Sequence, residues 1–180
     1  MSEYIEKYPW LRLQSLYSGD IYSDYDAMDD MPEGWRIAFG DLMCEELDAA
    51  IKKAGLEDEF VIYQVKEKYG RLVIYVSHET PEIRDILDRY NILSGWICIK
   101  CGKPDVHMLR LGWIHPSCEE CLSKTPCYEY AKYDEWTYAG DGKMRNTVTI
   151  KRCGKEHKIY LKDAADKIRA KWLEREIGRS

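Results

Sequence analysis

Two Cys-x-x-Cys pairs constrain the fold of this chain more than any other feature of its sequence. The stretch CIKCGKPDVHMLRLGWIHPSCEEC, residues 98–121, begins and ends with such a pair, and sixteen residues separate the two pairs. A Cys-x-x-Cys turn presents two thiolates on one edge of a tetrahedron, and two such turns complete the ligand shell that Zn²⁺ prefers. Gly102 follows the first pair, where a tight turn favours a residue without a Cβ atom. The spacing therefore predicts a zinc site formed by Cys98, Cys101, Cys118 and Cys121.

Four thiolates leave no open coordination position, so we expect the zinc to be structural rather than catalytic. The segment between the pairs has room for a short β-hairpin, and the second pair is typical of the first turn of a short helix. This order of turn, hairpin and helix is that of a treble-clef zinc finger. His115, Cys127 and Cys153 could also join a metal site, although His115 lies in a turn before Pro116 and Cys127 is typical of a small buried residue.

No phosphate-binding glycine loop and no Gly-x-Ser-x-Gly motif is present in the chain. The sequence therefore indicates a protein that is not an enzyme; a small enzyme with an unrecognised site stays open as an alternative. The first residues, MSEYIEKYPWLRLQ, lack the basic start and apolar run of a signal peptide, and no stretch is long and apolar enough for a membrane span. Seven cysteines without such a signal indicate a reducing compartment, so we expect a cytoplasmic protein.

The remaining patterns predict an α+β protein in three parts. Residues 1–95 form an N-terminal unit of helix, hairpin and helix with an acidic loop at 18–34, residues 96–127 form the zinc clip, and residues 128–180 form a basic part. Apolar spacing predicts the first helix over roughly 35–54 with Gly55 beyond its end, and a second helix with Thr80 as N-cap and Pro81 at its first position. Residues 134–177 of the basic part are predicted to form a three-stranded antiparallel meander followed by a helix, which covers roughly 164–177 and is capped by Asp163.

Residues 60–77, FVIYQVKEKYGRLVIYVS, are the clearest hairpin in the chain, with Gly70 available for a positive φ at the turn. Alternation along the two strands leads us to expect one face to be buried against the first helix, which carries Leu42 and Leu47. We assign to this buried face the side chains Tyr63, Val65, Val73 and Tyr75.

The charges are unevenly distributed along the chain. Residues 1–60 hold 5 Lys/Arg against 15 Asp/Glu, a net charge of -10, and residues 143–180 hold 12 against 5, a net charge of +7. Such asymmetry bears on binding partners rather than on fold. The acidic residues between tyrosines at 17–33 could imitate a line of phosphates, and we assign partner binding to Asp24, Asp26, Asp29 and Asp30. Direct nucleic-acid binding through residues 143–175 is the alternative, with Lys151, Arg152 and Lys158 as its contacts.

The order of motifs resembles that of small, largely uncharacterised zinc-binding proteins of phages, prophages and other bacterial mobile elements. The similar residues are Gly34-Trp35 at a helix start, QVKEKYGRLVIYV at 64–76, CIKCGKPD at 98–105, and Gly112-Trp113-Ile114 before SCEEC. The resemblance covers roughly 34–121 and implies zinc binding and a bacterial host, and it carries no catalytic residue to this chain. With the acidic loop, it leads us to expect an inhibitor that binds a nucleic-acid-handling host effector, such as a CRISPR or other defence nuclease.

Overall fold

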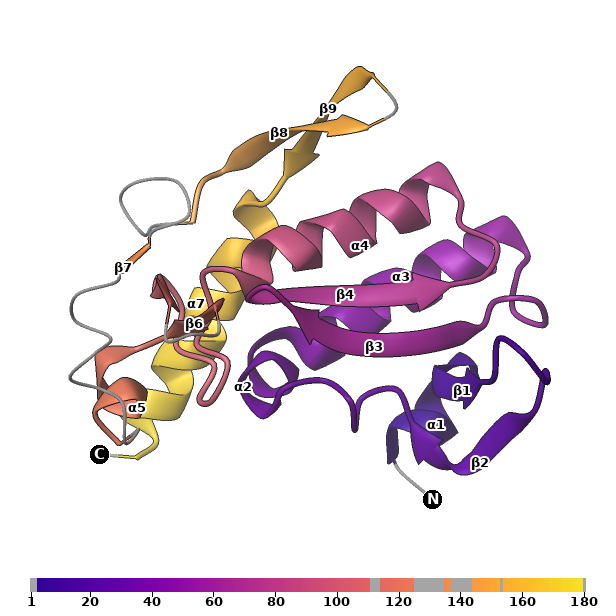
Figure 1. Cartoon of the computed structure of the whole chain (residues 1–180), viewed down its shortest axis with the longest axis horizontal. Helices are drawn as coiled ribbons and strands as arrows, with labels where there is room; N and C mark the ends of the chain where they lie inside the picture. The colour runs from indigo at the N-terminus through magenta and orange to yellow at the C-terminus, as the bar shows by residue number, and fades with distance from the viewer. Residues whose placement is uncertain (1–2, 111–113, 125–134, 137–143, 153, 180) are drawn as a thin grey trace.

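The computed structural model describes residues 3–110, 114–124, 135–136, 144–152 and 154–179. Over these residues the chain is a mixed α+β protein, as the sequence predicts (Figure 1). Its sheets have the strand orders β2-β1-β3-β4, β6-β5-β7 and β8-β9. The strands are β1 (Arg12–Gln14), β2 (Ile21–Asp26), β3 (Ile62–Lys68), β4 (Arg71–Val76), β5 (His107–Arg110), β6 (Ile114–Ser117), β7 (Glu135–Trp136), β8 (Thr147–Arg152) and β9 (Lys155–Tyr160).

The helices agree closely with the sequence patterns at the N-terminal unit. They are α1 (Glu3–Lys7), α2 (Glu33–Trp35), α3 (Asp41–Ala54), α4 (Pro81–Ser94), α5 (Glu119–Ser123) and α7 (Lys162–Ile177), with a 3₁₀ turn η1 (Pro9–Leu11). A π-helical turn, η2 (Arg36–Gly40), joins α2 to α3, so that one helical segment covers the predicted range. Gly55 ends it with a φ of 67°, and the Thr80 side chain accepts a hydrogen bond from the Ile83 N–H, as predicted.

The hairpin of β3 and β4 forms where it is predicted. Of the four side chains assigned to its buried face, Val65 is buried as predicted, and the assignment of Tyr63, Val73 and Tyr75 is wrong. Tyr69 and Gly70 both have positive φ and form a two-residue turn, which places Lys68 opposite Arg71. Val65 therefore faces Ile74, whereas Val73 lies opposite Lys66 on the outer face. A bulge at Tyr63 shifts the alternation again, so that Ile62 and Val65 are both buried. The helix-covered face consists of Ile62, Val65, Leu72, Ile74 and Val76, and Tyr63, Val73 and Tyr75 lie outside it.

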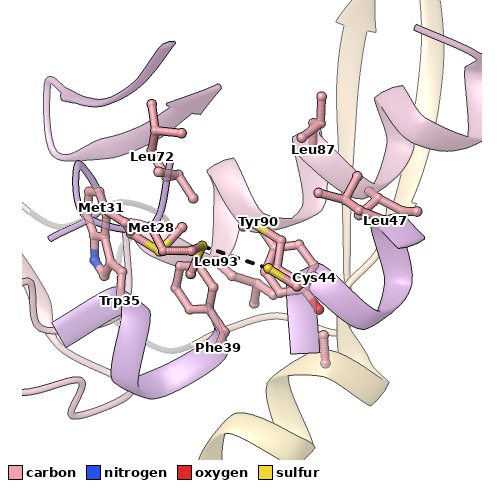
Figure 2. Packing of buried hydrophobic residues seen from close by; sticks show 14 of the residues in the cluster. Met28, Met31, Trp35, Phe39, Cys44, Leu47, Leu72, Leu87, Tyr90 and Leu93 are labelled. Carbon is pink, nitrogen blue, oxygen red and sulfur yellow. Dashed lines mark hydrogen bonds between the residues drawn. The ribbon is translucent and has the colours of Figure 1, made fainter. Parts of the chain in front are cut away.

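Helices α3 and α4 pack against each other beside this face of the hairpin (Figure 1). Figure 2 shows the centre of the core, where the rings of Phe39 and Tyr90 stack with their centroids 5.2 Å apart. The buried Cys44 thiol lies 3.8 Å from the Met28 sulfur. The same cluster of buried side chains extends from Tyr8 to Ile168, so the C-terminal helix contributes to the core of the N-terminal unit.

The acidic segment 18–34 is not one long loop, as the sequence led us to expect. Residues 21–26 form β2, which pairs antiparallel with β1 at the edge of the four-stranded sheet. Ile21, Tyr22 and Tyr25 are residue types that favour strands, and they allow this segment to pair once β1 lies beside it.

The C-terminal part contains a two-stranded hairpin rather than the predicted meander. β8 and β9 pair with each other, and β7 pairs with β5 of the clip, opposite Met108 and Leu109. Helix α7 begins at Lys162 with Leu161 as its N-cap, so Asp163 lies in the first turn and does not cap the helix. Leu161 is fully buried, and the helix starts two residues earlier than an N-cap at Asp163 would indicate.

Candidate metal centre

The first cysteine pair lies in a tight turn that the backbone itself closes. The Cys98 N–H donates to the Lys103 carbonyl at 2.8 Å, and the Gly102 N–H donates to the Cys98 carbonyl at 2.9 Å. Gly102 has a φ of 79°, a conformation that glycine adopts without the strain of a Cβ atom. These contacts explain why the sequence has glycine directly after Cys101.

The second cysteine pair is held by the start of helix α5. Strand β6 ends at Ser117, Cys118 is the N-cap residue, and its sulfur accepts a hydrogen bond from the Cys121 N–H at 3.4 Å. A helix N-terminus presents unpaired N–H groups and favours negative charge, and both properties stabilise a thiolate. The short helix therefore places the last two sulfurs side by side.

The four sulfur atoms of Cys98, Cys101, Cys118 and Cys121 lie within 4.8 Å of one another, so the group could hold a metal ion. Sulfurs bound to one tetrahedral Zn²⁺ lie about 3.8 Å apart, because each Zn–S bond is about 2.3 Å long. The sulfurs of Cys101 and Cys118 are 3.6 Å apart, close to that value. The structure therefore confirms that the four predicted ligands form a cluster that could hold a metal ion.

The electrostatics of the cluster differ from one thiol to the next. Burial opposes ionisation of Cys98, but N–H groups of Cys118, Cys101 and Lys100 outweigh it and lower the pKa of that thiol. Burial and the neighbouring Cys98 raise the pKa of Cys121 to about 11, and burial raises the pKa of Cys101 as well. A bound cation would supply the positive charge that allows all four thiols to ionise, and binding would release protons.

The cluster is docked against the start of α2 by unusually close backbone contacts. The Gly34 N–H donates to the Ile99 carbonyl at 2.9 Å, and the Trp35 indole N–H donates to the Ile97 carbonyl at 3.0 Å. A Cβ atom at Gly34 would lie 2.2 Å from the Cys98 carbonyl oxygen, and one at Gly102 would lie 2.7 Å from the Gly34 carbonyl oxygen. The Gly34-Trp35 pair and the first cysteine turn therefore form one interface.

The turn of the β3–β4 hairpin contacts the other side of the clip. A Cβ atom at Gly70 would lie 2.3 Å from the Met108 sulfur and 3.3 Å from the His115 Cα atom. Met108 is on β5 and is fully buried between this turn and Gly95, where a Cβ atom would lie 3.3 Å from its terminal methyl group. These two glycines make room for the clip hairpin on the body of the protein.

Helix α7 covers the clip from a third side (Figure 1). The Arg169 guanidinium donates to both Asp105 oxygens, at 2.8 and 3.1 Å, and Asp105 also accepts from the Met144 N–H at 3.0 Å. The Arg175 guanidinium donates to the Cys101 carbonyl at 3.4 Å. Sequence reasoning missed this support, because nothing local to Asp105 identifies a partner 64 residues away.

Of the additional metal ligands that the sequence left open, the structure describes His115 alone, and the group of four sulfurs does not include it. His115 lies in strand β6 opposite Leu109, and not in a turn as the sequence led us to expect. Cys127 and Cys153 lie outside the described residues.

The four carboxylates predicted to bind a partner do not form one exposed surface. Asp26 is 1% exposed and accepts a hydrogen bond from the Met28 N–H at 2.7 Å, so its assignment to the surface is wrong. The buried Asp26 carboxylate provides the hydrogen-bond acceptor that the buried Met28 N–H requires just after β2. Asp29 lies 3.8 Å from Arg36, and Asp30 accepts from the Tyr25 hydroxyl at 2.5 Å, which raises the pKa of Tyr25 to about 12. The side chain of Asp24 lies outside what the structure describes.

The three predicted nucleic-acid contacts have different surroundings. Arg152 forms ion pairs with Asp85, at 3.5 Å, and with Asp88, both on α4. Lys151 and Lys158 are exposed on β8 and β9, with the Lys158 ammonium 5.9 Å from the Tyr160 ring centroid. Part of the basic C-terminal charge is therefore balanced within the molecule, by Asp85 and Asp88 for Arg152 and by Asp41 for Lys171.

Comparisons with known proteins found no match, so a function can be argued only from the residues and their geometry. No family model, no curated protein and no solved structure matches the chain. Among the described residues, none of the helices has the length and apolar character needed to cross a membrane.

Proposed function

We propose that the four cysteines hold one structural Zn²⁺ in a treble-clef-like clip. The observation that carries this proposal is the grouping of four sulfurs within 4.8 Å, on a tight turn and a helix start joined through the β5–β6 hairpin. Zn²⁺ suits four thiolates in a tetrahedron, and a full shell leaves no position for a substrate or a reactive water. The metal would hold the clip against α2, the β3–β4 turn and α7.

Metal analysis of the purified, reduced protein tests this proposal. We expect one equivalent of zinc per chain, and we expect Cys101→Ser or Cys121→Ser to lose it. Cys44→Ser is the matched control, because Cys44 is buried in the core away from the cluster and should keep the metal. Protein that is free of metal when prepared under reducing conditions contradicts the proposal, and two equivalents would require a second site.

We further propose that the protein acts by binding another protein and not by catalysis. The partner we favour carries a basic, nucleic-acid-handling surface, as a CRISPR effector or other defence nuclease does, and the chain would inhibit it. Exposed tyrosines and carboxylates on the β1–β2 side support this: Tyr17, Tyr22 and Tyr25 are exposed, as are Asp20, Asp29 and Asp30. Buried Asp26 no longer contributes, and exposed Asp20 takes its place. Acidic groups in this arrangement attract a basic groove and repel free nucleic acid.

Affinity capture from bacterial lysate, with and without nuclease treatment, tests the proposed partner. Capture that survives nuclease treatment and weakens at high salt is expected, because screening reduces the attraction between exposed charges. Each exposed charge contributes about 1 kcal/mol or less, so the test variant combines Asp20→Asn, Asp29→Asn and Asp30→Asn. The matched control removes three exposed carboxylates of α7, with Asp163→Asn, Glu174→Gln and Glu176→Gln. Equal loss in both variants contradicts a specific acidic surface.

A second candidate function is direct nucleic-acid binding by the β8–β9 hairpin. The observation that favours it is the exposure of Lys151 and Lys158 on a two-stranded hairpin that lies above α4 in Figure 1. The test is binding to plain DNA or RNA with the Lys151→Glu/Lys158→Glu variant. Affinity that falls steeply with salt and disappears in this variant would establish the second candidate in place of the first.

A further inference from the structure

A tyrosine-lined groove lies beside the outer face of the four-stranded sheet, on the side away from α3 and α4. It encloses about 570 Å³, and its walls include Tyr17, Tyr22, Tyr63 and Tyr75 together with Leu16 and Lys66. Two of these tyrosines, Tyr63 and Tyr75, are the residues that the sequence pattern assigned to the core and that the hairpin register turns outward. Four tyrosine side chains therefore line one open groove, and contiguous exposed apolar surface of this kind often marks a binding site.

The loop between β1 and β2 forms the second wall of the groove. The Ser15 N–H donates to the Asp20 carbonyl at 2.9 Å, and the Gln14 side chain donates to the Gly19 carbonyl at 2.7 Å. These bonds hold the loop closed and leave the Tyr17 side chain 99% exposed at its tip. The groove is therefore built by a braced loop on one side and a β-hairpin on the other.

The charges around the groove select between possible occupants. Lys66 is the one charged side chain among the described residues that line it, and its ammonium donates to the Gln64 amide oxygen at 2.7 Å and lies 4.8 Å from the Tyr75 ring centroid. Exposed carboxylates are close to the groove residues in sequence. Asp20 is in the β1–β2 loop, where its carbonyl holds Ser15 of the groove wall, and Glu57, Asp58 and Glu59 come just before β3, with Glu59 3.6 Å from His78. A single-stranded nucleic acid needs a positively charged groove that follows its backbone, and a groove whose lining has Lys66 as its one described charged side chain does not provide it.

We propose that this groove binds an extended, proline-rich segment of a partner protein, with the lysines or arginines that flank its prolines facing the carboxylates. The inference rests on the proposed function, because it specifies the contact that a basic protein partner would make. A polyproline II segment is already extended, so little conformational entropy is lost on binding, and aromatic-lined grooves are a recurrent way to recognise it. Tyrosine rings pack against prolines, and their hydroxyl groups can donate to the free carbonyls of such a segment.

Titration with short labelled peptides tests the inference on the full chain. The probe is a Pro-x-x-Pro peptide flanked by arginines, compared with the same peptide flanked by glutamates and with a single-stranded oligothymidylate. We expect the arginine-flanked peptide to bind most tightly, and Tyr22→Ala or Tyr75→Ala to weaken it about tenfold, which corresponds to roughly 1.4 kcal/mol. Tyr160→Ala is the matched control, since Tyr160 is 67% exposed on β9, outside the groove, and its loss should leave affinity unchanged.

Several outcomes would overturn the inference. These are stronger binding of oligothymidylate, stronger binding of the glutamate-flanked peptide, no binding of any probe, or equal weakening by Tyr160→Ala. A folded state common to all variants, checked by circular dichroism, keeps the comparison valid. Failure of this inference is distinguishable from failure of the proposed function. If a partner is captured through the acidic residues but no peptide binds, the groove inference is wrong and the proposed function stands. Groove-dependent peptide binding supports the inference even if lysate yields no partner.

Discussion

At the scale of single residues, glycines decide how closely the clip approaches the rest of the protein. Gly34 and Gly102 bring two backbones into direct contact, and a Cβ atom on either would overlap a backbone atom of the other segment. Because backbone atoms cannot rotate away as a long side chain can, relief requires movement of the whole cysteine turn.

We predict that Gly34→Ala weakens both stability and metal retention. Forcing a methyl group into a packed interface costs roughly 1 to 3 kcal/mol, and the displaced turn carries Cys98. Thermal unfolding and zinc content measure the two effects. Gly178→Ala is the control, because Gly178 has an ordinary φ of -71° and its added Cβ would come no closer than 3.4 Å to a neighbour. Equal behaviour of the two variants would contradict the close contact.

Asp41 is a second residue whose role depends on distant partners. It accepts hydrogen bonds from the Tyr4 hydroxyl at 2.5 Å and from the Lys171 ammonium at 3.0 Å, so it joins α1, α3 and α7. Burial acts to raise the pKa of Asp41, but these two donors outweigh it and lower the pKa below its ordinary 3.8.

The lowered pKa of Asp41 predicts a loss of stability in acid. The carboxylate contributes its stabilisation fully above its unfolded pKa and loses it as pH falls through the lower folded value. Asp41→Asn should therefore be less stable than the native protein at neutral pH, by about 1 kcal/mol or less because the side chain is largely exposed. In urea-unfolding measurements the difference should begin to shrink as the pH is lowered past 3.8 and should vanish below the lower folded pKa of Asp41. A difference that grows in acid would contradict this assignment.

At the scale of elements, the β3–β4 hairpin shows how a turn and a bulge set which side chains are buried. The two-residue turn places even-numbered residues of β4 toward the helices, and the bulge at Tyr63 places both Ile62 and Val65 on that same face. The same register turns Tyr63 and Tyr75 outward, where they line the groove. The turn and the bulge therefore determine both the buried face and the proposed binding surface.

Two substitutions on neighbouring positions of β4 test the register. Leu72 is 1% exposed, and Leu72→Ala should lower the free energy of unfolding by about 3 kcal/mol, since it removes buried methyl groups and leaves a cavity. Val73 faces outward, so Val73→Ala should cost roughly 1 kcal/mol or less. Chemical denaturation measures both values. A larger loss of stability for Val73→Ala than for Leu72→Ala would contradict this register and support the buried face predicted from the sequence, which includes Val73.

At the scale of the whole molecule, the zinc clip packs against three elements that are far apart in the sequence. It contacts Gly34 at the start of α2, Gly70 at the hairpin turn, and α7 through the Arg169–Asp105 pair. Buried residues of α7 also belong to the main core, so the C-terminal helix joins the clip to the N-terminal unit.

Removal of the metal should therefore loosen more than the clip. We predict that a chelator lowers the stability of the reduced protein on the order of several kcal/mol, because metal binding is coupled to folding of its site. Hydrogen exchange should accelerate at the Gly34 amide and around the Tyr69–Gly70 turn as well as within residues 98–121. The Ile83 amide, bonded to the Thr80 hydroxyl at the far end of α4, serves as the control and should keep its protection longer. Exchange changes confined to the clip would show that docking does not depend on the metal.

Features that depend on neighbouring residues could be predicted from the sequence alone. The cysteine spacing, the end of α3 at Gly55, the Thr80-Pro81 start of α4 and the turn at Gly70 were all correct, because ligand turns, caps and tight turns are determined by a few adjacent side chains. The tertiary structure decided the rest. The burial of Asp26, the outward tyrosines, the pairing of β7 with β5 and the ion pairs of Arg152 and Arg169 all depend on groups many positions away. Long-range packing chooses among faces and partners that are locally equivalent, and so local patterns do not contain that choice.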